Sequence, residues 1–247
     1  MNLILFRPDE IKRFWCDGVL SVPLSDARGG HMIDVLKLGE GDSVKVGVVG
    51  EPSFGRMEVK AIKDRSIALV KTHDTEKSAP LNPVTMIIGQ VRPICMKRIL
   101  RDAVCLGIRQ VILALGETCE KSYANAGIYK NGEYLQFLLD GGMQAGSTLI
   151  SEVSFASSVA EAISMAGDAV QKILLDNEIG DGSLSSAVLK AVDTAVAIGP
   201  ERGWSDSERK LFTENGYSPM TIGPRIMRTE TAVPAGGAVL LSKMGLL

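Results

Sequence analysis

The chain has 247 residues, of which 45% are hydrophobic and 23% are charged, the balance of an ordinary globular protein with one large or two small domains. Its 27 Lys and Arg residues against 29 Asp and Glu residues give a net charge of −2, which excludes a strongly basic surface over the whole protein. The four cysteines form no CxxC pair, there are only two histidines, and no apolar run reaches the ~18 residues of a membrane span. We therefore expect a soluble, cytoplasmic protein that holds no metal and enters no membrane.

Residues 1–75 show the period-two alternation of a half-exposed antiparallel sheet. Val44, Val46 and Val48 share one face of a strand, and residues 56–62 alternate charged with apolar side chains. The turns between strands fall at short, regular intervals, at residues 41–42, 51–55 and 64–65. This pattern predicts a small meander or barrel that includes a short helix at 31–38. The polar stretch 76–83, which carries two prolines, is the predicted linker.

From residue 84 onward, apolar runs of strand length alternate with stretches of helical spacing. Runs that are apolar on both faces are typical of buried parallel strands, so residues 84–247 predict an α/β domain. The strand runs lie at 84–91, 110–115, 172–177 and 194–199. A helix with an inner apolar stripe is expected at 95–106. Another should begin at a capping box formed by Ser205 and Glu208.

The segments that leave the buried strands are the best candidates for a ligand site, because ligands favour the carboxyl ends of parallel strands. Three exits stand out, at residues 175–177, 199–203 and 222–228. Glycines there let the backbone approach a flat ligand, although the same sequences also suit simple turns. The sequence has no GxxxxGK[ST], no GxGxxG after a first strand and no GxSxG, which disfavours P-loop hydrolases, standard dinucleotide enzymes and α/β hydrolases.

Positive charge is concentrated between residues 92 and 109, a stretch with five basic residues and a single acidic one. Such a cluster could bind phosphates, or it could form a solvated helix face. The first domain offers a second basic set, and His31 lies beside a glycine-rich turn. The RNA-binding candidates from these groups are Arg7, His31, Lys37, Arg92, Lys97 and Arg101.

Two C-terminal strings resemble a paired family signature. TAVAIGPERGWSDSE, followed by IGPRIMRTETA, is similar to the IGPEGGxSxxE and LGxRILRTETA motifs of the RsmE-type ribosomal RNA uridine-N3 methyltransferases, a branch of the SPOUT class. Near the other end, GHMIDVLKLGEGD resembles the HHLxxVLRxxxGD motif of the family's PUA-like RNA-binding barrel.

The resemblance implies a PUA-like β-barrel at 1–75, a linker at 76–83 and a trefoil-knotted SPOUT methyltransferase domain at 84–247. It implies S-adenosylmethionine as cofactor, a homodimer whose active site draws on both subunits, and methylation of a uridine N3 in small-subunit (16S) ribosomal RNA, with that RNA or the small subunit as partner. By motif position, Arg228 and Glu201 are the catalytic candidates, with Arg228 stabilising the anionic base and Glu201 either bracing its loop or accepting a proton. The cofactor would be held by Leu175, Gly199, Pro200, Glu201, Gly203, Ile222, Gly223, Ile226 and Met227.

The chain departs from the family pattern at several points. Arg202 replaces a loop glycine and Lys37 replaces an arginine, while Asp102 and Cys105 stand where the family has lysine and glutamate. Pro234 and the glycines after it weaken the expected last helix, unless that helix begins near Val233. Two alternatives therefore stay open: methylation of a different RNA site, and a non-catalytic RNA-binding or ribosome-assembly protein that keeps the pocket as a relic.

Overall fold

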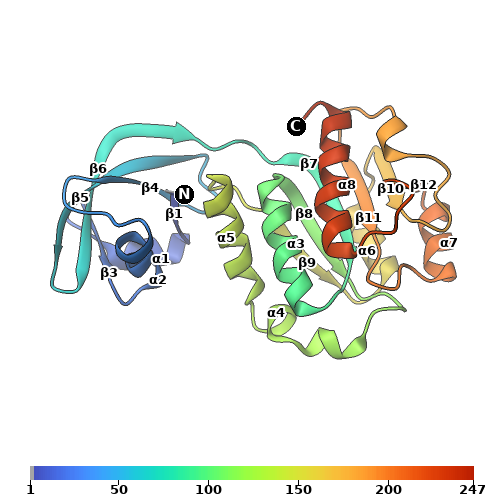
Figure 1. Cartoon of the computed structure of the whole chain (residues 1–247), viewed down its shortest axis with the longest axis horizontal. Helices are drawn as coiled ribbons and strands as arrows, with labels where there is room; N and C mark the ends of the chain where they lie inside the picture. Colours follow the sequence, from blue (N-terminus) through green and yellow to red (C-terminus); the bar gives the residue numbers. More distant parts are fainter. Residues whose placement is uncertain (1–2) are drawn as a thin grey trace. The chain divides into compact units, whose positions relative to one another are not determined.

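A six-stranded sheet forms the framework of the first unit (Figure 1). Its strand order is β1-β4-β5-β6-β3-β2, with β1 and β4 parallel and the other pairs antiparallel. Asp64 and Arg65 both have left-handed φ values, 51° and 58°, as a tight two-residue hairpin between β5 and β6 requires. The strands and helical segments are β1 (Leu3–Phe6), α1 (Pro8–Phe14), β2 (Trp15–Cys16), β3 (Val19–Pro23), α2 (Ala27–Gly30), a π-helical turn (His31–Val35), β4 (Ser43–Val48), β5 (Ser53–Lys63) and β6 (Ser66–Lys77).

The core of this unit lies on the face of the sheet that the alternation predicts. Val44, Val46, Met57 and Val59 are buried there, and Met32 of the π-helical turn is fully buried among them. Within the predicted short helix at 31–38, His31–Val35 form the π-helical turn, which continues α2, and residues 36–38 lie outside it.

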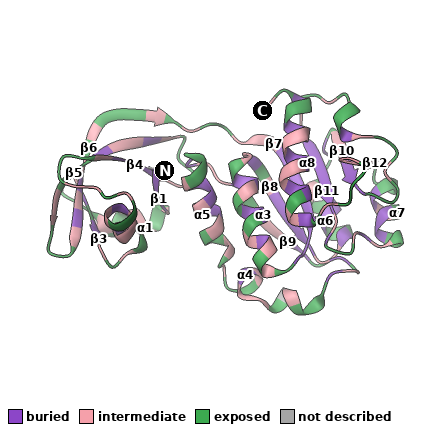
Figure 2. Ribbon diagram, in the orientation of Figure 1, coloured by how far each residue is buried: buried purple, intermediate pink, exposed green. Residues whose placement is uncertain are grey.

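The second unit is a parallel sheet of six strands in the order β12-β10-β11-β7-β8-β9. The central strands are buried along their length because helices cover both faces (Figure 2). Ile87 and Ala197 pack toward α6 and α7, whereas Met86 and Leu175 lie against α8 on the other face. The elements are β7 (Asn82–Gly89), α3 (Pro93–Cys105), β8 (Ile108–Ala114), a 3-10 helix (Lys121–Asn125), α4 (Gly127–Lys130), α5 (Tyr134–Ala145), β9 (Glu152–Ala156), α6 (Val159–Ala166), β10 (Gln171–Leu175), a 3-10 helix (Leu184–Ser186), β11 (Thr194–Ile198), α7 (Asp206–Glu214), β12 (Ser218–Met220) and α8 (Thr229–Met244).

The computed structural model describes residues 3–247, and the α/β class with a barrel-like first unit is confirmed. Each predicted strand run contains a strand, and the Ser205–Glu208 capping box begins α7. Within residues 3–247, no helix combines the length and apolar character needed to cross a membrane.

The boundary between the units differs from the predicted linker at 76–83. Strand β6 continues to Lys77 and β7 begins at Asn82, so only residues 78–81 connect the two strands. The first unit also takes in Gly142–Ile150, while the second comprises Leu81–Gly141 and Ser151–Leu247. Thr148 is fully buried, donates to the carbonyl oxygen of Glu51 at 2.6 Å and bonds to Ser78. No local sequence pattern could show that residues 142–150 pack into the first unit, because their contacts there span up to 97 residues of sequence.

The last helix forms over Thr229–Met244, although Pro234 and the glycines after it were expected to weaken it. It begins at Thr229 rather than near Val233, so Pro234 lies inside the helix. The Thr229 hydroxyl donates to the carbonyl oxygen of Gly199 at 2.9 Å, which fixes the start of α8 against the loop after β11. A Cβ on Gly236 would lie 2.7 Å from Leu175 Cδ1, and one on Gly237 would lie 2.8 Å from Leu106 Cδ1. These glycines thus allow α8 to approach the sheet closely, which offsets their low helix propensity.

Candidate functional site

All three predicted strand exits meet at the carboxyl ends of β10 and β11. The loop at 199–203, the segment at 226–229 and the residues that follow β10 surround a cavity of about 250 Å³, which we call the loop cavity. Its lining residues are Leu175, Asp176, Asn177, Glu178, Ile198, Gly199, Pro200, Glu201, Arg202, Gly203, Arg209, Ile226, Met227, Thr229 and Ala232. Apolar residues and polar or charged ones contribute about equally to this lining, so the cavity offers both apolar contact and groups that can orient a ligand.

The loop at 199–203 is a tight turn. The Gly203 N–H donates to the carbonyl oxygen of Pro200 at 2.9 Å, and Gly203 has a left-handed φ of 69°. A Cβ on Gly199 would lie 3.0 Å from Gly203 Cα, so the loop closes tightly on itself and leaves backbone at the cavity wall. Arg202 is exposed at the same cavity, which stays open with this side chain present.

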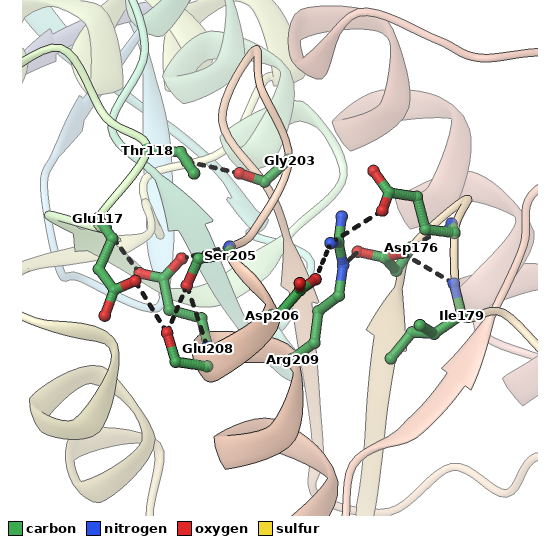
Figure 3. A network of polar contacts seen from close by, with 11 residues as sticks. Glu117, Thr118, Asp176, Ile179, Gly203, Ser205, Asp206, Glu208 and Arg209 are labelled. Atoms are coloured by element: carbon green, nitrogen blue, oxygen red, sulfur yellow. Dashed lines mark hydrogen bonds and ion pairs between the residues drawn. The ribbon is translucent and has the colours of Figure 1, made fainter.

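Arg209 of α7 joins the helix to the segment that follows β10 (Figure 3). Its Nε donates to Asp176 at 2.9 Å, and the guanidinium also forms ion pairs with Glu178 at 3.0 Å and Asp206 at 3.1 Å. The other oxygen of Asp176 accepts the backbone N–H groups of Glu178 and Ile179. The carboxylates at this wall of the loop cavity are therefore held in place.

On its other side, the start of α7 is bonded to the segment after β8 (Figure 3). The buried Glu208 carboxylate accepts the Ser205 N–H at 2.8 Å, completing the capping box, and the Glu117 N–H, also at 2.8 Å. Thr118 donates its hydroxyl to the carbonyl oxygen of Gly203 at 2.6 Å. The capping box thus also fixes the loop at 199–203 relative to the sheet.

A second cavity, of about 390 Å³, adjoins the first and is lined by Arg92, Cys95, Glu201, Ile226, Met227, Arg228 and Glu230. We call it the outer cavity. Glu201, Ile226 and Met227 line both cavities and so form their common wall. Glu201 accepts the backbone N–H of Arg92 at 3.0 Å, and Arg92 Nε donates to the Tyr123 hydroxyl. Burial and the neighbouring Glu230 raise the pKa of Cys95, so its thiol stays neutral.

The structure places the cofactor candidates in two groups. Leu175, Gly199, Pro200, Glu201, Gly203, Ile226 and Met227 line the loop cavity. Ile222 and Gly223 do not: Ile222 packs toward α8, with its Cδ1 3.3 Å from the Cβ position of Gly236, and Gly223 has open space around it. Of the two catalytic candidates, Glu201 lies on the wall between the cavities and Arg228 lines the outer cavity.

The RNA-binding candidates fall into both units. Arg7 forms ion pairs with Asp9 and Glu10, while His31 begins the π-helical turn and Lys37 is exposed. In the second unit, Arg92 lines the outer cavity. Lys97 and Arg101 lie over the Phe137 ring, each 5.0 Å from its centroid, and Arg101 also pairs with Asp140 at 2.7 Å. Acidic or aromatic partners thus engage Arg7, Lys97 and Arg101.

The sequence did not single out Arg209, Glu230 or Cys95 as site residues. Arg209 follows the capping glutamate at the start of a predicted helix. The sequence there does not distinguish a buried arginine from an exposed one. Glu230 lies within the RTETA motif. The motif identifies the segment, but it does not indicate which of its side chains lines a site. In the described part of the chain, no three His, Cys, Asp or Glu side chains gather as metal ligands.

Comparisons with known proteins show what this chain is similar to. A family model described as an RNA methyltransferase domain matches residues 77–241. Ribosomal RNA small subunit methyltransferase E of Treponema pallidum is 35% identical over 98% of this chain and 91% of its own length. Ribosomal RNA small subunit methyltransferase E 1 of Borreliella burgdorferi is 30% identical over 99% of each chain. A crystal structure of the Neisseria gonorrhoeae methyltransferase E bound to S-adenosyl methionine shares the fold, with a TM-score of 0.77, 18% identity and coverage of 98% and 97% of the two chains.

Proposed function

Because this chain belongs to the small-subunit ribosomal RNA methyltransferase E family of RNA methyltransferases, we propose that it transfers a methyl group from S-adenosylmethionine to N3 of a uridine in 16S ribosomal RNA. The observation that carries this proposal is the pair of adjoining cavities at the carboxyl ends of the sheet. One cavity would hold the cofactor and the other the base, with Glu201, Ile226 and Met227 between them.

The residues of the loop cavity fit S-adenosylmethionine. The backbone of the 199–203 turn offers N–H and C=O groups to an adenine edge, and Leu175 and Ile198 supply apolar contact for the ring. Asp176 and Glu178 provide fixed carboxylate oxygens that can accept hydrogen bonds from ribose hydroxyls or from the amino group of the methionine part. When bound, the cofactor supplies an activated methyl group on a positively charged sulfur.

The chain's own contribution is mainly alignment and charge. Rigid loops that hold two reactants in a near-attack geometry supply several kcal/mol of a reaction barrier, within the ~7–11 kcal/mol known for well-oriented reactions. Arg228 at the outer cavity provides a cation for the negative charge that develops on the base oxygens. Glu201, whose carboxylate accepts the Arg92 N–H, acts as the brace between the two cavities.

RNA contact would extend beyond the base. The first unit corresponds to the RNA-binding barrel of the family, and His31 and Lys37 remain available there for phosphate contact. In the second unit, Arg92 is exposed at the rim of the outer cavity. Arg7, Lys97 and Arg101 would have to exchange their present partners for phosphates.

We also propose a homodimer in the cytoplasm, where small ribosomal subunits are made. Ile94 at the start of α3 is 64% exposed and Ile226 beside the cavities is 85% exposed. Apolar side chains so exposed next to a site are suited to burial against a partner subunit. Sedimentation of the full chain at micromolar concentration would measure the oligomeric state directly.

The test combines binding and product analysis. The wild-type protein should bind S-adenosylmethionine in calorimetry, and Gly199→Val should abolish binding because its side chain would enter the backbone of the 203–204 segment. Mass spectrometry of 16S RNA from a deletion strain should show loss of N3-methyluridine. Persistence of that nucleoside with loss of another would indicate a different RNA target, and absence of methyl transfer by the purified protein would indicate a non-catalytic role.

A further inference from the structure

The outer cavity contains more charged groups than methyl transfer by alignment alone requires. Two arginines and two glutamates contribute to its lining, together with the neutral thiol of Cys95. One of these glutamates, Glu201, already accepts the backbone N–H of Arg92. The other, Glu230, interacts with the Cys95 thiol but forms no ion pair within residues 3–247, and neither does Arg228.

Glu230 is held at this cavity by the start of α8. It follows Thr229, which is buried and donates its hydroxyl to the carbonyl oxygen of Gly199. A single contact therefore fixes the residue before Glu230 to the cofactor loop itself. The charged and titratable groups that face Glu230 are Arg92 and Cys95 from the start of α3, Glu201 from the loop after β11, and Arg228 before α8.

The charged groups that line this cavity can supply what one base edge needs. The Watson–Crick edge of uracil presents an acceptor, a donor and an acceptor, namely O4, N3–H and O2. A carboxylate accompanied by two guanidinium groups presents the matching donor, acceptor and donor. Cytosine has an unprotonated N3, whose lone pair would face the carboxylate without a hydrogen between them. Flipped bases are commonly read in this way, by hydrogen bonds to the Watson–Crick edge.

We propose that the outer cavity is a uracil subsite in which Glu230 accepts the N3–H and removes its proton, while Arg92 and Arg228 bind the two carbonyl oxygens. This inference rests on the proposed function and names its proton acceptor. Glu230 thus differs in role from Glu201, which braces the loop.

The step balances as follows. The N3–H bond breaks and its proton passes to a Glu230 carboxylate oxygen, leaving the electron pair on N3. That pair forms the new N–C bond to the methyl carbon as the C–S bond breaks, and the C–S pair returns to sulfur, which becomes a neutral thioether. The protonated Glu230 then releases its proton to water. N3-methyluridine no longer offers a hydrogen to Glu230, so the pocket favours substrate over product.

Two variants separate the roles of Glu230. Glu230→Gln keeps the size and an acceptor oxygen but cannot take a proton, and Glu230→Ala removes both. In single-turnover methylation of small-subunit RNA, Glu230→Gln should lower the rate about 10²–10⁴-fold, the range that a general base contributes. Its deficit should shrink as the pH rises toward ionisation of uridine N3, where no base is needed. Glu214→Gln, an exposed position at the end of α7 outside both cavities, is the matched control and should behave like wild type.

A binding measurement gives a readout without turnover. In the absence of cofactor, the wild-type protein should bind uridine monophosphate more tightly than N3-methyluridine monophosphate in NMR titrations. Glu230→Ala should lose this discrimination, and all variants should bind S-adenosylmethionine with wild-type affinity. A wild-type rate in Glu230→Gln, a deficit that does not change with pH, or retained discrimination in Glu230→Ala would each overturn the proposal. Failure of the wild-type protein to methylate any RNA would instead refute the proposed function, and the nucleotide titration would still test whether Glu230 binds the uracil N3–H.

Discussion

The Nε of Arg209 donates to a carboxylate oxygen of Asp176 at 2.9 Å, and the two side chains are only 8% and 4% exposed. The same Asp176 side chain accepts the backbone N–H groups of Glu178 and Ile179 through its other oxygen. One buried ion pair therefore connects helix α7 to the segment that lines the loop cavity.

Replacing Arg209 with methionine should damage both stability and ligand binding. The change leaves Asp176 as a buried carboxylate without its cation, which costs about 3–5 kcal/mol. Urea unfolding should show this loss, and calorimetry should show weaker S-adenosylmethionine binding because the 176–179 segment loosens. Lys210→Met is the control, since the Lys210 side chain is 75% exposed and should change stability by less than about 0.5 kcal/mol. Unchanged stability of Arg209→Met would contradict the importance of the pair.

Gly89, the last residue of β7, lies against the loop at 199–203, and Gly89→Ala should displace that loop. The new Cβ would lie 2.4 Å from Pro200 Cδ and 2.6 Å from Pro200 N, and a backbone atom cannot rotate away. We expect a destabilisation of about 1–3 kcal/mol. We also expect at least a roughly tenfold loss of S-adenosylmethionine affinity, equal to about 1.4 kcal/mol. Gly30→Ala, at a helical position with no atom nearer than 3.6 Å, should leave that affinity intact.

The adjacent glycines of α8 form a matched pair. An alanine Cβ at position 236 would meet Leu175 Cδ1 at 2.7 Å, whereas one at 237 would meet Leu106 Cδ1 at 2.8 Å and Met86 Cε at 3.0 Å. Alanine gains about 1 kcal/mol of helix propensity at either position, which partly offsets the crowding. Only Gly236→Ala pushes against a residue of the loop cavity, so only this variant should weaken cofactor binding in calorimetry. Equal effects of the two substitutions on binding would show that Leu175 does not contribute.

Asp26 should give the first unit a measurable sensitivity to acid. The Arg28 side chain donates two hydrogen bonds to Asp26, each of 2.8 Å, and this holds the pKa of the carboxyl below its usual value. A lowered folded-state pKa stabilises the protein above the unfolded value of about 3.9, and this stabilisation is lost as the pH falls through the folded value. Asp26→Asn keeps the N-cap acceptor of α2 but removes the charge, which should cost about 1.5–3 kcal/mol at pH 7.

The same substitution should flatten the stability profile below about pH 4, where the wild-type carboxyl also becomes neutral. Thermal unfolding of the first unit can be followed through Trp15 in a Trp204→Phe background, because Trp204 belongs to the second unit. A wild-type protein whose stability does not fall faster than that of Asp26→Asn in this range would contradict the prediction.

Features encoded by neighbouring residues were predictable from the sequence. The capping box at 205–208, the buried strand runs and the turn at 64–65 depend on spacings of a few residues, and the structure has each of them. The approach of the loops at 199–203 and 226–229 followed from strand exits and from motif resemblance. The ion pair between Arg209 and Asp176 joins residues 33 positions apart, and no spacing rule marks such a pair.

Pro234 shows a position at which packing overrides a local rule. The rule places Pro at the first turn of a helix. The Thr229 bond to Gly199 instead starts α8 five residues before Pro234. Most residues that line the outer cavity were candidates from the sequence, but their meeting in one cavity was not predictable, because they come from three segments that only the fold brings together.

The membership of Gly142–Ile150 in the first unit imposes an order on biosynthesis. The buried Thr148 forms hydrogen bonds with Glu51 and Ser78, so the N-terminal sheet emerges from the ribosome before a buried part of its own unit. Until translation passes Ile150, the Glu51 carbonyl and the Ser78 hydroxyl of the nascent sheet lack their Thr148 partner. A gene fragment that stops at the predicted linker should therefore encode a protein that cannot complete its own fold.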